Sequence, residues 1–367
     1  MSWPNVTDSG GVVWTTSGRA AIFLALRALG VKPGDRVLVP TYHCPTMIAP
    51  AVHLGAMPVF FSITATGGPD LAYLRTLDTS GVKALLVAHY FGLAQPVRQL
   101  RRFCDERGIA LIEDCAHAFF GESEDLPIGA TGDVAIASLS KFFPVTEGGC
   151  LVARRSLDAV RPAHRSWRDS VRLGWDAVEL GARYRRLAWL DSPVRALAAA
   201  KDLLRGRNTG GLQLASDPTD DSLAGLTQID EAQAQRSPAR ITRWLVEAAD
   251  VERIVTNRRR NFALFDSLLS DCARAWPLAN DLPTTAVPYV FPLRVKNPEP
   301  VYRRIRARGV PVFRWDIAWP QTPEIPGDVG LTWAREIFQL ACHQDMEEAD
   351  VRLVAHELRA ILDVECE

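Results

Sequence analysis

Short apolar runs alternate with amphipathic stretches through the first part of the chain. The runs at residues 36–39, 59–63 and 83–89 have the length of buried strands, and the stretches at 46–54 and 96–107 carry apolar residues at helical spacing. Strands that alternate with helices usually form a parallel sheet with helices on its faces. The pattern therefore predicts an α/β fold with a mostly parallel central sheet flanked by helices.

The pattern changes after residue 155. Residues 157–207 are expected to form a helical region in which tryptophans alternate with a dense series of arginines. Long helices are expected next, and then strands and helices alternate again to the end of the chain. We therefore expect a large domain over residues 1–245, which includes the helical region, and a smaller C-terminal α+β domain over residues 246–367.

The composition excludes several classes of protein. Hydrophobic residues make up 47% of the 367 residues, charged residues make up 23%, and the net charge is -1, so the bulk charge gives no reason to expect nucleic-acid binding. The seven cysteines contain no CxxC pair, which favours a reducing compartment over a disulfide scaffold or a metal site. The first ten residues lack a signal-peptide pattern, so we expect a cytoplasmic protein.

The arginine-rich region at 157–207 has several interpretations. An aromatic and basic helical face can contact a phosphorylated substrate, a membrane or a partner subunit, and it can also be an ordinary solvated surface. Asp169, Asp176 and Glu179 dilute the basic face. We therefore favour the solvated surface and do not expect membrane contact.

The densest chemistry lies between residues 111 and 150. An expected buried strand ends on Glu113 and Asp114, and a second apolar run ends near Lys141, which is followed by a Glu-Gly-Gly turn. In open α/β sheets, ligands bind at the carboxyl ends of the strands. An acid at one strand end and a lysine near another are what an aldehyde cofactor needs. We therefore place the active site in this stretch.

A second candidate lies near the N-terminus, where Ser17, Gly18 and Arg19 precede a helical stretch that ends on Gly30. Free backbone N–H groups and the helix dipole favour a phosphate at such a helix start. Taken alone, the pattern is equally typical of an ordinary N-capped helix.

Three short motifs connect these candidate sites: EDCAHA at 113–118, SLSK at 138–141 and TEGG at 146–149. They resemble the landmarks of the DegT/DnrJ/EryC1/StrS aminotransferase family of sugar transaminases. The SGRAA segment that begins at Ser17 resembles the SGTAA segment of the same family. The resemblance implies fold type I of the pyridoxal-phosphate-dependent transferases, and pyridoxal 5'-phosphate as the cofactor.

The resemblance also implies roles for single residues. Lys141 matches the lysine that binds the cofactor aldehyde covalently, Asp114 matches the acid that pairs with the pyridine nitrogen, and His117 matches the position near the phenolic oxygen. These three are the expected catalytic residues. The cofactor phosphate is expected at Ser17, Gly18 and Arg19, with Arg19 where threonine is usual, and at one of two serines, Ser138 or Ser140. The segment before Lys141 is shorter than in the family, which leaves the choice of serine open.

An aromatic side chain that stacks on the cofactor ring is also implied by the resemblance. The candidates here are Tyr42 and His43, and we favour His43 because a flat imidazole can stack as a phenol does. Arg314 and Trp315 follow an expected strand at 310–313 and are candidates to face the substrate.

The implied reaction is the conversion of a keto sugar, expected to be nucleotide-linked, to an amino sugar. Glutamate or glutamine is the expected donor, and the product would enter surface polysaccharides or secondary metabolites. The family also implies a homodimer with shared active sites. Two alternatives stay open. The first is an enzyme of the same fold with another reaction or a non-sugar acceptor, which agrees with the lack of a match to the family at 157–207. The second is a non-catalytic scaffold or regulatory protein.

Overall fold

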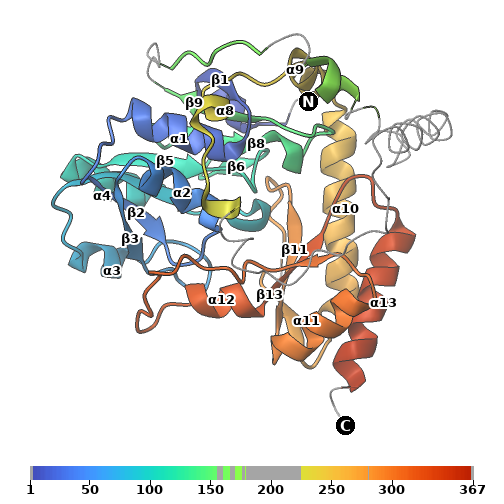
Figure 1. Ribbon diagram of the computed structural model, residues 1–367. Coiled ribbons are helices and arrows are strands. Elements are labelled where there is room, and N and C mark those ends of the chain that lie inside the picture. Colours follow the sequence, from blue (N-terminus) through green and yellow to red (C-terminus); the bar gives the residue numbers. More distant parts are fainter. Residues whose placement is uncertain are drawn as a thin grey trace, which may run out of the picture.

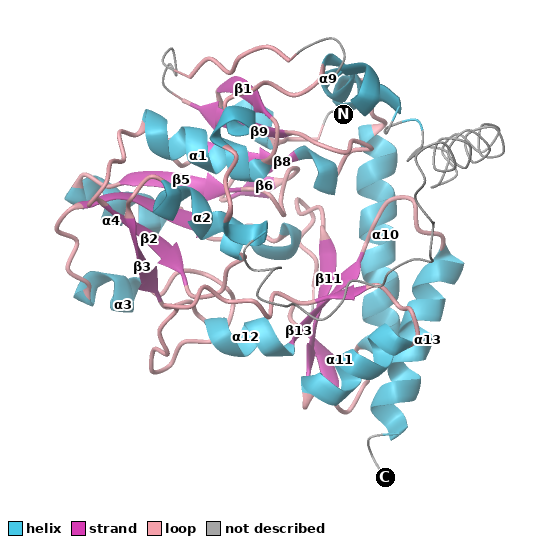
Figure 2. Cartoon of the chain, viewed as in Figure 1, coloured by secondary structure: helices cyan, strands magenta, loops and turns pink. Residues whose placement is uncertain are grey.

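A computed structural model describes residues 3–154, 160–165, 170–175, 178, 225–279 and 281–364 (Figure 1). Most of the arginine-rich region at 157–207 lies outside the described residues. In the described part, a large sheet and a small sheet are each covered by helices, and the long helix α10 (Val251–Leu269) runs beside α13 (Glu348–Val364). Figure 2 shows α1, α2 and α4 over the large sheet, and α10, α11 and α13 beside the small one.

The large sheet has seven strands in the order β1-β9-β8-β5-β4-β2-β3. The pairs between β8 and β3 are parallel, and β9 is antiparallel to both of its neighbours. The predicted, mostly parallel sheet is therefore confirmed. The strands are β1 (Gly11–Thr15), β2 (Arg36–Pro40), β3 (Met57–Phe61), β4 (Val82–Ala88), β5 (Ala110–Asp114), β8 (Val134–Ser138) and β9 (Gly149–Ala153).

The reversal at β9 was not predicted, and chain length explains it. Parallel neighbours need a crossover connection of a dozen or more residues, usually with a helix. Only the short turn η3 (Leu139–Lys141) and the loop up to Gly149 separate β8 from β9. The chain therefore turns back beside β8, and this return keeps Lys141 at the carboxyl end of β8.

Three of the four helices on the large sheet begin and end within a few residues of where the sequence pattern places them, and the fourth, over residues 71–76, was not predicted. Ser17 caps the first of them by accepting a hydrogen bond from the Ala20 N–H, and Gly108 ends another with a left-handed φ of 63°. These elements are α1 (Gly18–Ala28), α2 (Pro45–His53), α3 (Leu71–Thr76) and α4 (Arg98–Arg107). Smaller elements are η1 (Val6–Ser9), η2 (Tyr90–Gly92), β6 (Glu122–Ser123) and β7 (Leu126–Pro127).

The small sheet is antiparallel, with the order β10-β11-β13-β12. Its core contains Phe265, Leu293, Phe338 and Leu358, all without exposed surface. The strands are β10 (Ala275–Pro277), β11 (Val290–Val295), β12 (Val312–Phe313) and β13 (Ile337–Ala341). Other helices of the described part are α8 (Glu231–Ala234), α9 (Arg240–Glu247), α11 (Pro298–Ala307) and α12 (Gly330–Glu336).

Helix α10 packs into both parts of the molecule. Ile254 and Val255 lie in an apolar cluster with residues that follow β5 and β8, whereas Phe262 and Phe265 lie in the core of the small sheet. Trp333 of α12 is buried in the core of the large sheet. The two parts therefore share their packing, and the predicted domain boundary between residues 245 and 246 stays a prediction.

Within the described residues, no helix combines the length and the apolar run that would cross a membrane. The six cysteines of this part carry free thiols. The same residues contain no group of three or more side chains arranged to hold a metal ion.

A glycine at the contact between the two parts gives a test of this packing. Gly92 has φ +97°, and a β-carbon there would lie 2.4 Å from the Val287 carbonyl oxygen, whereas Gly30 has φ +76° and open space around it. We expect Gly30→Ala to lower the free energy of unfolding by about 1 kcal/mol, because only the left-handed backbone is strained. Gly92→Ala should cost about 2 kcal/mol more because of the clash. Urea denaturation measures both values, and equal costs would contradict a fixed contact.

Candidate active site

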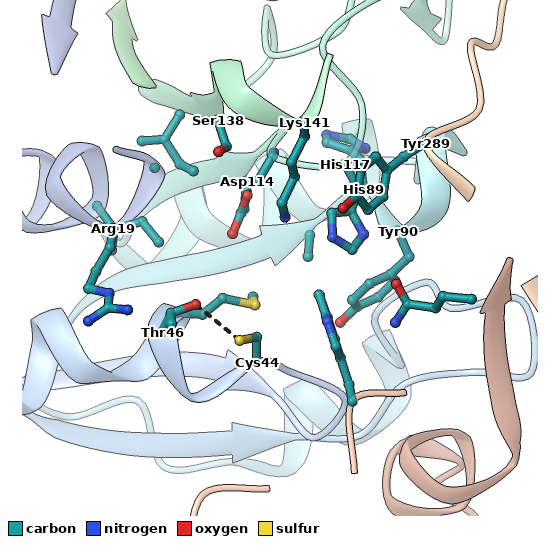
Figure 3. A pocket seen from close by; sticks show the side chains of 18 of the residues that line it. Arg19, Cys44, Thr46, His89, Tyr90, Asp114, His117, Ser138, Lys141 and Tyr289 are labelled. Atoms are coloured by element: carbon teal, nitrogen blue, oxygen red, sulfur yellow. Dashed lines mark hydrogen bonds between the residues drawn. The ribbon is translucent and has the colours of Figure 1, made fainter. Parts of the chain in front are cut away.

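A cavity of about 450 Å³ lies at the carboxyl ends of β4, β5 and β8 (Figure 3). The N-terminus of α1 forms one side of the cavity, and residues of β11, β13 and the loop after β12 form the other. Among the residues predicted for catalysis and cofactor binding, the following line it: Ser17, Gly18, Arg19, Asp114, His117, Ser138 and Lys141. Groups from three separate stretches of the chain therefore meet in one place.

The TEGG turn brings the N-terminus of α1 close to the end of β8. A β-carbon at Gly149 would lie 2.4 Å from the Ser17 carbonyl carbon, so only glycine fits, and the Gly148 N–H donates to the Thr16 carbonyl at 2.8 Å. A β-carbon at Gly18 would lie 3.3 Å from the Ser138 β-carbon. The free amides of α1 and the Ser138 side chain therefore lie beside one another, as an anion site requires.

Arg19 lines the cavity and is held from outside it. Its Nη1 donates to the Gln228 carbonyl at 2.7 Å and, at 3.4 Å, to that of Gly225. Partial burial lowers the pKa of the guanidinium, and Cys44 opposes the fall. Arginine side chains in proteins are effectively always protonated at neutral pH. The positive charge and the helix dipole of α1 therefore favour the same anion.

Asp114 and Lys141 face the same cavity with opposite charges (Figure 3). Burial raises the pKa of Asp114, while the Ala116 N–H, which donates to its Oδ1 at 2.9 Å, and the Lys141 amine oppose the rise. Burial lowers the pKa of Lys141, and Asp114 opposes the fall. Loss of water moves both groups toward their neutral forms. Because their opposite charges stabilise each other, each group limits the pKa shift of the other.

His117 presents an unsatisfied group within this cavity. The side chain is buried, and its Nδ1 has no hydrogen-bond partner. Burial, aided by the nearby Lys141 charge, lowers the pKa of His117 well below 6.5, so the ring is neutral. The ring packs against Tyr289 and Trp315, with centroids 4.5 and 4.8 Å apart. A buried polar atom without a partner is rare and marks a place where a ligand is expected to bind.

A hydrogen-bonded pair, His89 and Glu113, lies beside Asp114, and His89 also lines the cavity. His89 Nε2 lies 2.9 Å from Glu113 Oε2, and its Nδ1 accepts a hydrogen bond from the Gln95 N–H, so Nε2 carries the proton. Burial alone would raise the pKa of Glu113, but hydrogen bonds from His89 and from the Gly132 and Thr131 amides keep it below the usual value. All of these groups have hydrogen-bond partners, and their hydrogen bonds hold the end of β5 in place.

Three predicted cofactor-binding residues lie outside the wall of the cavity. Ser140 is exposed, so Ser138 is the serine that faces the cavity. The Tyr42 ring is fully buried and packs against Tyr90 and Trp315. His43 is buried against Phe60, with both ring nitrogens engaged. The stacking role of Tyr42 or His43 stays a prediction, and Cys44 is the residue of this segment that lines the cavity.

Several lining residues were not singled out from the sequence. Tyr289 lies with its ring centroid 5.3 Å from the Lys141 Nζ, and Cys44, Met47 and Gln339 complete the wall beside it. Met47 comes from the stretch at 46–54 that was expected to be a helix, and no local signal separates any of these four residues from core residues. The expected positions of Arg314 and Trp315 at the cavity agree with the structure, although Glu299 and Asp316 pair with Arg314.

The described part of the arginine-rich region contacts the TEGG turn. Arg165 Nη2 lies 2.7 Å from Glu147 Oε2, and the other oxygen of Glu147 accepts a hydrogen bond from the Ala239 N–H at 2.9 Å. Both side chains of the ion pair are about one-tenth exposed. One arginine of this region therefore braces the turn that carries Gly149.

The donor set suits pyridoxal phosphate, which the sequence resemblance implies. A partly buried primary amine, a buried carboxylate and a neutral imidazole with a free Nδ1 share one cavity with a helix N-terminus. These groups match the needs of an aldehyde, a pyridine nitrogen, a phenolic oxygen and a phosphate, respectively.

Comparisons with known proteins agree with this arrangement. Residues 6–159 match the DegT/DnrJ/EryC1/StrS aminotransferase family. GDP-perosamine synthase of Vibrio cholerae is 29% identical over 201 residues, which cover 51% of this chain and 54% of that protein. Lipopolysaccharide biosynthesis protein RfbH of Salmonella typhimurium is 32% identical over 168 residues, 42% of this chain and 38% of that protein. The matches span about half the length of these relatives, or less.

Longer matches cover nearly the whole chain at lower identity. The dTDP-4-dehydro-2,3,6-trideoxy-D-glucose 4-aminotransferase of Saccharopolyspora spinosa is 26% identical, with 97% of this chain and 86% of that protein covered. The crystal structure of S. venezuelae DesV has a TM-score of 0.64 at 22% identity, covering 96% of this chain and 85% of that one. Helicobacter pylori PseC has a TM-score of 0.66 at 14% identity, covering 98% and 88%. The predicted fold class, fold type I, is confirmed.

The surroundings of His43 predict a pH dependence of stability. Burial lowers its pKa from 6.5 to about 4, although hydrogen bonds to the Pro40 and Thr41 main chain oppose the fall. Its Nε2 accepts the Trp319 N–H and cannot take a proton without breaking that bond. The unfolded chain binds this proton first, so stability should fall as the pH drops from 7 to 4, by about 3 kcal/mol. His43→Gln keeps an acceptor but does not titrate. Urea denaturation of both proteins at the two pH values measures the difference, and equal losses would contradict the assignment.

Proposed function

We propose that this chain, which matches the DegT/DnrJ/EryC1/StrS aminotransferase family over residues 6–159, is a pyridoxal-phosphate-dependent aminotransferase. It converts a keto sugar to an amino sugar with an amino acid, glutamate or glutamine, as the donor. The observation that carries the proposal is the single cavity lined by the Lys141 amine, the Asp114 carboxylate and the N-terminus of α1.

Each polar group of the cavity has a part in holding the cofactor. The Lys141 Nζ would hold the aldehyde covalently, Asp114 would pair with the pyridine nitrogen, and the free Nδ1 of His117 would serve the phenolic oxygen. Ser17, Gly18 and Arg19 of the α1 N-terminus bind the phosphate together with Ser138. When bound, the cofactor supplies a ring that accepts electrons from the carbon that loses its proton.

The chain's own groups move and hold the protons. Burial lowers the pKa of Lys141, which favours the neutral amine that a general base requires. Asp114 stays beside this amine, and its charged form keeps the pyridine nitrogen protonated. His117 stays neutral, so it can donate or accept one hydrogen bond at Nδ1 without adding charge.

The choice of a sugar acceptor rests on the names of the relatives. GDP-perosamine synthase and the dTDP-4-dehydro-2,3,6-trideoxy-D-glucose aminotransferase are both named for nucleotide sugars. A nucleotide-linked keto sugar that serves polysaccharide or secondary-metabolite synthesis is therefore the acceptor we propose. Trp315, Tyr289 and Gln339 line the part of the cavity that would receive it. A second copy of the chain is proposed to complete the phosphate site.

Replacing Lys141 tests the cofactor assignment. We expect purified wild-type protein with pyridoxal phosphate to be yellow, and borohydride to fix the cofactor on the peptide that contains Lys141, because a primary amine traps the aldehyde. Lys141→Ala should lose both the colour and the fixed adduct. Lys83→Ala is the control and should keep both, because Lys83 is the exposed second residue of β4 and does not line the cavity at the strand's carboxyl end. A colourless wild-type protein that takes up no cofactor would favour the scaffold alternative.

Replacing Asp114 separates binding from chemistry. Asp114→Asn should retain cofactor, because Lys141 and the phosphate site remain, but an amide cannot keep the pyridine nitrogen protonated. We expect the half-reaction with glutamate or glutamine to slow on the order of 100-fold. Stopped-flow absorbance measures the rate, and Asp125→Asn, an exposed carboxylate, is the control. A wild-type protein that binds cofactor but shows no spectral change with either donor would favour another reaction of the same fold.

A further inference from the structure

Arg258 of α10 is a fully buried arginine that contacts the catalytic lysine's main chain. Its Nη2 donates to the Lys141 carbonyl at 2.6 Å, its Nη1 donates to the Pro288 and Tyr289 carbonyls at 3.2 Å each, and its Nε donates to Gln344 Oε1 at 2.8 Å. The guanidinium also lies 4.6 Å from the centre of the Phe142 ring. One side chain thus joins three separate segments of the chain.

All four of these hydrogen-bond acceptors are neutral oxygens. Burial lowers the pKa of Arg258 to about 10, so the group is still charged at neutral pH although no carboxylate is among these acceptors. Burying a cation in this way is unfavourable unless its hydrogen bonds are well made. Arg259 and Arg260, which follow it on α10, donate to carbonyls at part-buried or exposed positions. The burial of Arg258 therefore calls for a role that its neighbours do not share.

The segments that Arg258 joins carry the groups around the Lys141 amine. Lys141 ends the turn η3, so its carbonyl has no partner within that turn, and Gln344 Nε2 donates to the next carbonyl, that of Phe142, at 2.9 Å. The centre of the Tyr289 ring lies 5.3 Å from the Lys141 Nζ, and the same ring packs on His117. The relative positions of amine, phenol and imidazole therefore depend on two main-chain carbonyls held by one guanidinium.

We propose that Arg258 is a positioning residue for the proton transfer at the Lys141 Nζ. Its rigid fork holds the backbone of Lys141 and that of Tyr289 at a fixed separation, and this sets the direction from which the amine reaches the donor's carbon. The inference rests on the proposed function. The charge of Arg258 also acts on Tyr289, because it opposes the rise in the Tyr289 pKa that burial causes.

A lysine substitution separates positioning from simple packing. Arg258→Lys keeps the positive charge and most of the apolar stem, but a single ammonium cannot reach all three carbonyls with the geometry of a planar fork. The matched control is Arg259→Met, because Arg259 lies on the same helix and donates to the Pro283 and Ala286 carbonyls of the same loop without contacting Lys141.

The first measurement uses the protein without added cofactor. The amides of Phe142 and Phe143, which donate to Leu139, and that of Tyr289, which donates to Phe91, report on the two segments by hydrogen exchange. We expect Arg258→Lys to speed exchange in both segments and Arg259→Met to leave the segment at 142 and 143 unchanged. Unchanged exchange in both segments of Arg258→Lys would overturn the coupling.

The second measurement uses the protein loaded with pyridoxal phosphate. We expect Arg258→Lys to lower kcat about 10- to 100-fold, because a small displacement of a reacting group costs that much, with a smaller change in the donor KM. The pH midpoint of the visible absorbance band should also shift, while Arg259→Met keeps kcat and the midpoint. If Arg258→Lys matches Arg259→Met in kcat and midpoint and differs only in Tm, Arg258 is structural and the proposal is wrong.

Gln344→Leu provides a second route if Arg258→Lys does not fold. It removes the acceptor of Nε and the donor to Phe142 but leaves the cation in place. The same shifts in exchange and in the pH midpoint are expected, at smaller size, and their absence would overturn the proposal. A wild-type protein that takes up no cofactor would reject the proposed function and the catalytic role with it, while the exchange data would still decide whether Arg258 couples the two segments.

Discussion

The backbone of Ser17 lies against Gly149, where a β-carbon would come within 2.4 Å of the Ser17 carbonyl carbon. This contact brings the N-terminus of α1 to the carboxyl edge of the sheet, next to Ser138. It depends on the reversal at β9. This strand follows the loop after Lys141 and runs antiparallel to β8. The amine and the anion site are therefore neighbours for two reasons. The connection between β8 and β9 is short, and Gly149 has no side chain to keep Ser17 away.

Electrostatics in the cavity follow from burial and from the two opposite charges inside it. Burial acts on Asp114 and Lys141 in opposite directions, and each group moderates the shift of the other. His117 lies beside the same amine and is held neutral. The Glu113 and His89 pair lies beside this set with its hydrogen bonds satisfied, so it fixes the strand end.

The two parts of the molecule meet through α10. Its first turns pack with residues next to the large sheet, and its later turns pack with the small sheet, so a shift of the helix moves both walls of the cavity. Arg258 lies between these two sets of contacts and holds the Lys141 carbonyl from one wall and the Tyr289 carbonyl from the other. The geometry at the amine is therefore a property of the whole fold and not of one loop.

Local patterns in the sequence determined the order of strands and helices, the mostly parallel sheet and the positions of Asp114, His117 and Lys141 at its edge, because strand ends and helix starts depend on neighbours in the chain. The same patterns could not determine that β9 runs antiparallel, since direction depends on the length available for the return. They could not separate Ser138 from Ser140, or Cys44 from Tyr42 and His43, because which side chain faces the cavity is decided by packing against other elements. The cluster at Arg258, Arg259 and Arg260 shows the same limit: three identical residues differ only in their position around α10, and the tertiary contacts alone bury the first against Lys141.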